Sequence, residues 1–174
     1  MKKIVVAGGG VLGSQIAFQA AYCGCDVTVW LRSEGSIGRT KPKLETLRQT
    51  YLETIEAMAG PEGKTPQVWA CGIADEAAFA PEACRRQVER AAASIRPELD
   101  LAKAAGGAEL VIESMAENAD DKIAFYKKLA PVLPEKAILA TNSSTLLPSK
   151  LAKYTGRPEN YLAMHFANSI WKNN

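Results

Sequence analysis

The sequence predicts an α/β fold with a doubly wound, mostly parallel sheet. Short apolar runs alternate with helical patterns along most of the 174 residues. Repeated strand–helix units require parallel strands with helices on both faces of the sheet. A glycine-rich turn follows the first run directly, and polar residues follow several of the later ones. We expect one domain over residues 1–174, with a helical hairpin inserted after the second strand at about residues 41–93.

Each element is predicted from its hydrophobic period and its flanking turn residues. The predicted strands span residues 3–7, 27–31, 94–96, 109–113, 137–140 and 161–164, and 94–96 has the weakest pattern. Helices are predicted over about 12–23, 43–59, 81–93, 99–105, 120–133 and 147–154. Residues 32–43 are polar, contain two glycines and Pro42, and are predicted to form a loop. Residues 64–79 show no clear period and could form a short strand or a packed loop.

The turn after the first strand has the spacing G-x-G-x-x-G in Gly8, Gly10 and Gly13. A strand before it, and a helix and a second strand after it, are the context of a Rossmann-type dinucleotide-binding motif. Gly8 would allow the tight turn, Gly10 the approach of a pyrophosphate, and Gly13 close packing of the helix on the sheet. The helix N-terminus at Val11 and Leu12 would offer N–H groups to the phosphates.

Composition argues against several other classes of protein. The net charge of +2 favours neither a nucleic acid nor a membrane surface as partner, and no segment approaches a membrane-spanning length. The four cysteines form no C-x-x-C pair and there is one histidine, so no metal site is expected. Reduced cysteines suit a cytoplasmic protein. A phosphoryl-transfer enzyme is not expected, because no Lys-Ser or Lys-Thr pair closes the glycine turn.

Polar residues collect just past the carboxyl ends of the predicted strands. Residues 114–117 follow the fourth strand, 142–144 the fifth and 165–168 the sixth. Ligands of open α/β sheets bind along this edge. The single histidine, His165, therefore lies where a functional role is favoured over a structural one.

Four motifs occur in order along the chain: GGGVLG at 8–13, LVIESMAEN at 110–118, ATNSST at 140–145 and MHFAN at 164–168. Their order and spacing resemble the N-terminal domain of the 3-hydroxyacyl-CoA dehydrogenases, and the inserted hairpin matches as well. The resemblance covers essentially the whole chain. It implies hydride transfer between a nicotinamide cofactor and C3 of a 3-hydroxyacyl-CoA or 3-oxoacyl-CoA.

The resemblance also implies roles for individual residues. His165 matches the catalytic histidine that takes the proton of the 3-hydroxyl group, a task suited to an imidazole near neutral pH. Ser144 matches a serine that hydrogen-bonds the reacting oxygen, and Asn168 an asparagine near this oxygen and the nicotinamide. Glu117 and Lys122 match cofactor contacts on the nicotinamide side, where Ser144 and Asn168 also belong.

The chain departs from the family where it ends. It stops at Asn174, before the place of the glutamate that orients the family's histidine, and before the helical C-terminal domain. We expect a truncated chain that binds nucleotide but is nearly inactive, and an intact protein that forms a homodimer through the missing domain. Lys41, Lys43 and Arg48 are candidate contacts for the acyl-CoA phosphates, although the residues alone do not place the CoA site.

A second departure concerns the choice of cofactor. NAD is the family default, and an acid at the end of the second strand would bind its ribose 2′-hydroxyl. That position is Leu31, followed by Arg32 and Ser33. Without the carboxylate nothing repels a 2′-phosphate, and Arg32 could pair with one. The sequence therefore favours NADP(H), unless Glu34 replaces the missing acid.

Two other interpretations stay open. One is a related β-hydroxyacid or hydroxy-amine dehydrogenase, with the same cofactor and histidine but no CoA. The other is a nucleotide-binding module without catalysis, which the missing glutamate would favour if the truncation is natural.

Overall fold

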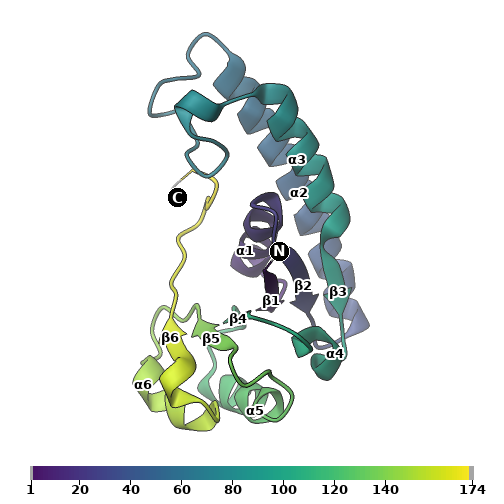
Figure 1. The fold of residues 1–174 in the computed structure, drawn as a ribbon, viewed down its shortest axis with the longest axis vertical. Helices are drawn as coiled ribbons and strands as arrows, with labels where there is room; N and C mark the ends of the chain where they lie inside the picture. Colours follow the sequence, from purple (N-terminus) through teal and green to yellow (C-terminus); the bar gives the residue numbers. More distant parts are fainter. Residues whose placement is uncertain (1, 173–174) are drawn as a thin grey trace.

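The computed structural model describes residues 2–172 and contains a six-stranded, entirely parallel sheet (Figure 1). The strands lie in the order β3-β2-β1-β4-β5-β6. Their bounds are β1 Lys3–Ala7, β2 Asp26–Trp30, β3 Arg96–Glu98, β4 Leu110–Glu113, β5 Ile138–Thr141 and β6 Tyr161–Ala163. This order confirms the predicted doubly wound α/β fold, with its ligand-binding switch point between β1 and β4. Residues 1, 173 and 174 of the predicted domain lie outside the described residues.

Helices cover both faces of the sheet. They are α1 Val11–Tyr22, α2 Glu34–Ala59, α3 Pro81–Ser94, α4 Leu101–Ala105, α5 Ala119–Leu129 and α6 Pro148–Leu151. In β1, Ile4 and Val6 belong to the core shared with α1, α2 and α3, whereas Val5 and Ala7 belong to the core shared with α4, α5 and α6. Alternate residues of one strand thus serve opposite faces.

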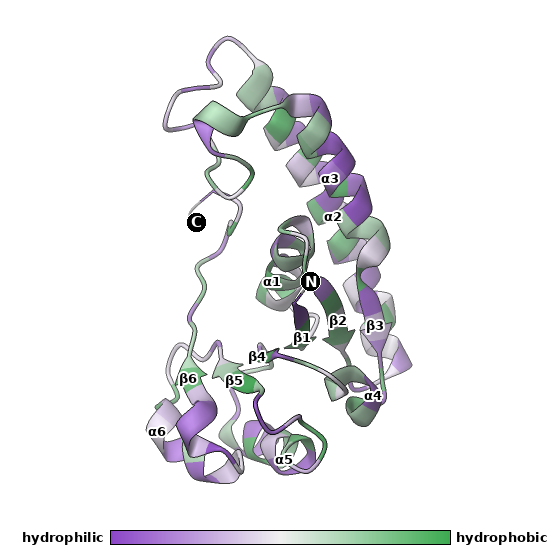
Figure 2. Cartoon of the chain, in the orientation of Figure 1, coloured by the Kyte–Doolittle hydropathy of each residue, from purple (hydrophilic) through white to green (hydrophobic). Residues whose placement is uncertain are grey.

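Hydrophobic residues are concentrated in the sheet, as in β5 and β6, while α3 is largely hydrophilic (Figure 2). Between residues 2 and 172, no helix combines the length and the apolar character that crossing a membrane requires. The two cores lie on either side of the sheet, and they hold the carboxyl ends of β1, β4, β5 and β6 along one edge.

The predicted loop over residues 32–43 is wrong, because α2 begins at Glu34 and continues through Pro42. The Ser33 side chain accepts a hydrogen bond from the N–H of Ser36 and caps the helix. A proline inside a helix costs about 3 kcal/mol. Here the buried face of α2, which includes Leu47 and Tyr51, packs into the core and offsets that cost. The insertion therefore begins near residue 34 rather than 41.

The remaining corrections are small. Residues 64–79 form turns and one short 3₁₀ helix, Glu76–Ala78, so the packed-loop alternative is confirmed and Ile73 is buried in it. The weak strand predicted at 94–96 lies two residues later as β3. The predicted helix at 147–154 consists of α6 followed by a 3₁₀ turn, Ala152–Tyr154.

After β6 the chain runs in an extended path to the tip of the α2–α3 hairpin (Figure 1). The N–H of Gly72 donates to the carbonyl of Trp171 at 2.9 Å. The ring centroids of Trp171 and Tyr51 are 5.5 Å apart. Nearer the sheet, the N–H of Ser169 donates to Gln15 Oε1 of α1 at 2.9 Å. These contacts hold the segment that carries His165 across the ligand-binding edge.

Candidate functional site

The glycine turn after β1 has the geometry that a pyrophosphate needs. Gly8 has a φ of +117°, and a Cβ there would overlap the carbonyl oxygen of Ser114. A Cβ on Gly13 would overlap the carbonyl of Gly8, so α1 packs closely on the turn. Gly10, in contrast, has no neighbouring atom within 4 Å of a Cβ position and faces open space. Because Gly10 caps α1 without a side-chain hydrogen bond, the N–H groups of the first turn, at Val11 and Leu12, can bind phosphate oxygens.

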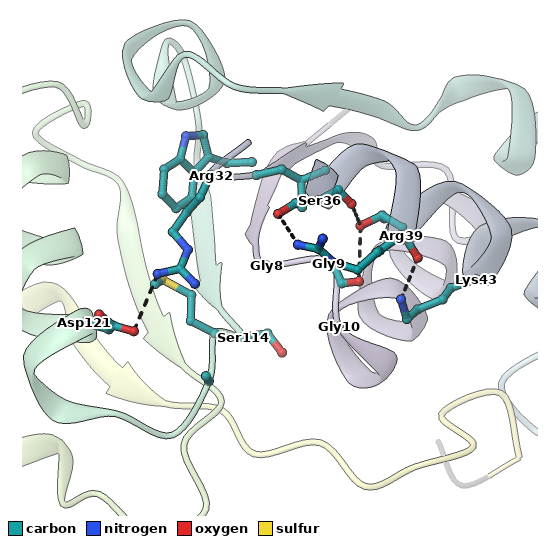
Figure 3. A pocket seen from close by; sticks show the side chains of 14 residues that line it. Gly8, Gly9, Gly10, Arg32, Ser36, Arg39, Lys43, Ser114 and Asp121 are labelled. Atoms are coloured by element: carbon teal, nitrogen blue, oxygen red, sulfur yellow. Dashed lines mark hydrogen bonds and ion pairs between the residues drawn. The ribbon is translucent and has the colours of Figure 1, made fainter. Parts of the chain in front are cut away.

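A pocket of about 220 Å³ lies beside this turn (Figure 3). Its walls are the glycine turn, the end of β2, the first turns of α2, the loop after β4 and Asp121 of α5. Leu31 and Arg32 line it, and Nη1 of Arg32 lies 3.6 Å from Oδ2 of Asp121. Ser33 caps α2 instead of lining the pocket, and Glu34 does not line it either. No carboxylate from the end of β2 therefore lines this pocket.

The reactive end of the candidate site is a hydrogen-bonded pair. Ser144 Oγ, in the loop after β5, lies 3.1 Å from Nε2 of His165, which follows β6. Both side chains are exposed to solvent. The N–H of Phe166 donates to Asn142 Oδ1 at 2.8 Å and joins the two loops. The structure thus brings together Ser144 and His165, while Asn168 lies three residues farther along the same exposed segment.

Glu117 organises the loop that carries Ser144. Its Oε1 accepts the N–H groups of Ser144 and Thr145, each at 3.0 Å, and the hydroxyl of Ser143. Nζ of Lys122 lies 3.2 Å from its Oε2. Partial burial raises the pKa of Glu117, but the hydrogen bonds from Ser143 and Thr145 and the Lys122 ammonium outweigh this and lower the pKa to about 2. Glu117 is therefore a carboxylate at neutral pH.

Glu113 is a member of this network that the sequence analysis did not single out. It is fully buried at the end of β4, and its Oε2 accepts from Lys122 Nζ at 2.9 Å and from the hydroxyls of Tyr126 and Thr141, each at 2.8 Å. Lys122 is 1% exposed, so its ammonium bridges Glu113 and Glu117 inside the protein. The sequence signal that could have identified Glu113 is an acid at the end of an apolar strand with a lysine nine residues later.

The sequence analysis also missed the role of the first turns of α2. Ser36, Arg39, Thr40 and Lys43 line the pocket, and their spacing of three, four and seven residues would have revealed a common helix face had Ser33 been identified as a cap.

The three cations considered for CoA, Lys41, Lys43 and Arg48, are not brought together. Lys43 faces this pocket, Lys41 lines a groove toward α3, and Arg48 is paired with Glu45 and Glu89. Among residues 2–172, no group of three or more His, Cys, Asp or Glu side chains could hold a metal ion.

A protein-family model described as "3-hydroxyacyl-CoA dehydrogenase, NAD binding domain" matches residues 3–173. The chain belongs to this family. A mitochondrial hydroxyacyl-coenzyme A dehydrogenase from Sus scrofa is 28% identical over 98% of this chain and 48% of its own length. The fatty acid oxidation complex subunit alpha of Pseudomonas savastanoi pv. phaseolicola is 29% identical over 98% of this chain and 20% of its own length. The chain therefore spans half or less of the length of these relatives.

Solved structures share the fold of this chain. A diketoreductase described by its dual catalysis of dicarbonyl compounds is 39% identical, with a TM-score of 0.78, over 100% of this chain and 53% of its own. An (S)-3-hydroxybutyryl-CoA dehydrogenase from Ralstonia eutropha is 23% identical with a TM-score of 0.72, over 98% and 50% of the two chains, and supports the fold alone. Membership of the family, whose matching model is an NAD binding domain, supports a nicotinamide cofactor for this chain.

Proposed function

We propose that this domain belongs to an enzyme that transfers hydride between a nicotinamide cofactor and C3 of a 3-hydroxyacyl-CoA or 3-oxoacyl-CoA. The Ser144–His165 pair carries the proposal, because it lies at the same edge of the sheet as the glycine turn. The names of the curated relatives, a hydroxyacyl-coenzyme A dehydrogenase and a fatty acid oxidation subunit, support acyl-CoA as the substrate class.

The side chains of the site divide the chemistry as follows. A bound nicotinamide supplies or accepts the hydride. His165 takes the proton of the 3-hydroxyl during oxidation and returns one to the oxygen during reduction. The Ser144 hydroxyl donates a hydrogen bond to this oxygen and stabilises its developing negative charge. Glu117 fixes the backbone of the Ser144 loop, and we assign Glu117 and Asn168 to the nicotinamide side. Lys122 is 1% exposed between Glu113 and Glu117, so its proposed part on that side is to position Glu117 rather than to touch the cofactor.

For the cofactor we propose that NADP(H) is accepted or preferred. Leu31 stands where an acid would bind the ribose 2′-hydroxyl, and it is 3% exposed. Arg32 lines the same pocket. Glu34, the alternative acid for the ribose 2′-hydroxyl, does not line it. The pocket thus presents no carboxylate from the end of β2 that would repel a 2′-phosphate.

Three further proposals concern the chain as a whole. It should bind nucleotide alone but turn over slowly, since it spans about half of its hydroxyacyl-CoA dehydrogenase relatives. The intact enzyme should dimerise through its remaining domain. We also propose a cytoplasmic location, which the free thiols of its four cysteines support.

Reduction of a dicarbonyl compound without CoA is a second candidate. The diketoreductase is 39% identical to this chain, against 28% for the hydroxyacyl-coenzyme A dehydrogenase and 29% for the fatty acid oxidation subunit. This likeness favours an enzyme in which His165 and the nicotinamide cofactor of this chain act on a dicarbonyl substrate without CoA.

The test compares substrates and cofactors with the complete gene product. Acetoacetyl-CoA, a free 3-oxo acid and a small diketone are each offered with NADH and with NADPH, for the wild type and His165→Ala. Activity with acetoacetyl-CoA that His165→Ala abolishes supports the leading proposal, and activity with the diketone alone supports the second candidate. Nucleotide binding without any turnover would indicate a non-catalytic module. Unchanged activity of His165→Ala would refute the mechanism.

A further inference from the structure

One face of α2 points its polar side chains toward the glycine turn. Ser36, Arg39, Thr40 and Lys43 share this face because three, four and seven residues separate them along a helix. All four line the pocket, and Figure 3 shows Ser36, Arg39 and Lys43 beside the glycine turn. The face begins at Ser36, in the first turn of α2 and just after the end of β2 at Trp30, where open α/β folds of this type bind the adenosine ribose.

Thr40 fixes this face relative to the glycine turn. Its hydroxyl lies 3.2 Å from the carbonyl oxygen of Gly9 and 2.8 Å from that of Ser36, and the residue is 3% exposed. A Cβ on Gly9 would overlap the Thr40 side chain. The two segments are therefore packed without a gap, so the cations of α2 have a defined position beside the phosphate-binding turn.

The cations on this face are bonded only to neutral oxygens. Nη2 of Arg39 lies 3.0 Å from Ser36 Oγ, and Nζ of Lys43 lies 2.6 Å from the Arg39 carbonyl. Neither is ion-paired with any carboxylate in the described part of the chain, whereas Arg32 is already paired with Asp121. The lining residues include three cations and one carboxylate. The pocket therefore has an excess of positive charge on its α2 side.

We infer that Ser36, Arg39 and Lys43 form the binding site for the 2′-phosphate of NADP(H). A guanidinium can hold two phosphate oxygens, while an ammonium and a hydroxyl can donate to the others. The inference rests on the proposed nicotinamide cofactor and deepens it. It moves the determinant of cofactor choice from Arg32, which is ion-paired with Asp121, to the first turns of α2.

The test is isothermal titration calorimetry of the chain with NADPH, NADH and 2′,5′-ADP, which carries the 2′-phosphate without nicotinamide. Arg39→Gln and Lys43→Gln should each weaken NADPH and 2′,5′-ADP by about tenfold or more, because each removes a charge-assisted hydrogen bond. Binding of NADH should change little. Lys41→Gln is the matched control, since it removes the same charge from the same helix but off the pocket-lining face. Thermal unfolding of each variant checks that the fold is kept.

The outcomes separate this inference from the proposed function. If the wild type binds neither NADH nor NADPH, the nicotinamide site itself is wrong, and the phosphate site with it. If NADH binds but Arg39→Gln and Lys43→Gln leave the NADPH affinity unchanged, the inference alone fails. A selective loss of NADPH in Arg32→Gln, with both α2 variants unaffected, would return the role to Arg32 and would also overturn the inference.

Discussion

The two ends of the candidate site are built in different ways. The end proposed to bind adenosine comes mainly from residues 8–43, where the connections after β1 and β2 lie side by side, with residues 114–116 of the loop after β4. Its charged residues are mostly cations. At the reactive end, Glu117 in the loop after β4 holds the loop after β5, and the hydrogen bond between Asn142 and Phe166 joins the segment after β6. One end is a local cradle that we propose binds phosphate, and the other is a long-range hydrogen-bonded frame for Ser144 and His165.

This difference shows which property each end can control. Changes at the adenosine end should alter which nucleotide binds and how tightly, with no direct effect on proton transfer. Changes at the reactive end should alter the chemical step and the acid stability of the loop network, with smaller effects on nucleotide affinity. The following predictions are ordered by the size of the expected effect.

Ser144→Ala should give the largest effect. In the complete gene product it should lower turnover of acetoacetyl-CoA by about 10²- to 10³-fold, the usual loss for one donor to a developing oxyanion. NADPH affinity, measured by calorimetry, should stay near the wild-type value. Ser149→Ala removes an exposed hydroxyl of α6 and serves as the control. An equal loss of turnover in both variants would show that Ser144 has no special role.

Gly10→Ala should weaken both nucleotides. The new methyl group meets no protein atom within 4 Å, so the thermal unfolding temperature should not fall. It would occupy space that a pyrophosphate needs, at a cost of about 1–3 kcal/mol. Gly38 also has open space around a Cβ position, but it lies within α2 and does not line the pocket. Gly38→Ala should therefore keep wild-type nucleotide affinity and gain roughly 0.5–1 kcal/mol in stability. Full nucleotide affinity in Gly10→Ala would argue against pyrophosphate at this turn.

Leu31→Asp should reverse the cofactor preference. The new carboxylate would accept a hydrogen bond from a ribose 2′-hydroxyl and repel a 2′-phosphate, so the ratio of the NADPH and NADH dissociation constants should rise by about tenfold or more. Leu31→Asn disturbs the buried position similarly without adding charge. The same ratio in both variants would mean that packing, not charge, sets the preference.

Glu117→Gln should have the smallest effect, visible in acid. The pKa of Glu117 falls to about 2 in the folded protein, below its ordinary value of about 4.5. Between these two pH values the unfolded chain therefore binds more protons than the folded protein. Its contribution to stability is therefore present above pH 4.5 and is lost as the pH falls toward 2. Urea unfolding from pH 5 to 2 should show a shallower decline for the variant than for the wild type. Parallel curves would contradict the assigned pKa.

Local chemistry explains what could be predicted and what could not. The glycine turn and the strand of Lys3–Ala7 were visible because each depends on neighbouring residues. The start of α2 was misjudged because Pro42 and two glycines disfavour a helix locally, whereas the cap at Ser33 and the buried face of the helix favour it. The ion pair of Glu113 and Lys122 was missed as well. The spacing of the two residues was visible in the sequence, but the burial of their charges is decided by elements that meet only in the folded chain.

The sequence alone determined the alternating α/β pattern, the glycine turn after the first strand, the absence of an acid at Leu31 and the position of the single histidine just past the last strand. Only the tertiary structure decided that Ser144 meets His165, that Asp121 holds Arg32, and that Arg39 and Lys43 stand beside the glycine turn. The physical reason is distance along the chain: a motif records what one segment can do, whereas packing between segments decides which charges and donors face the same ligand.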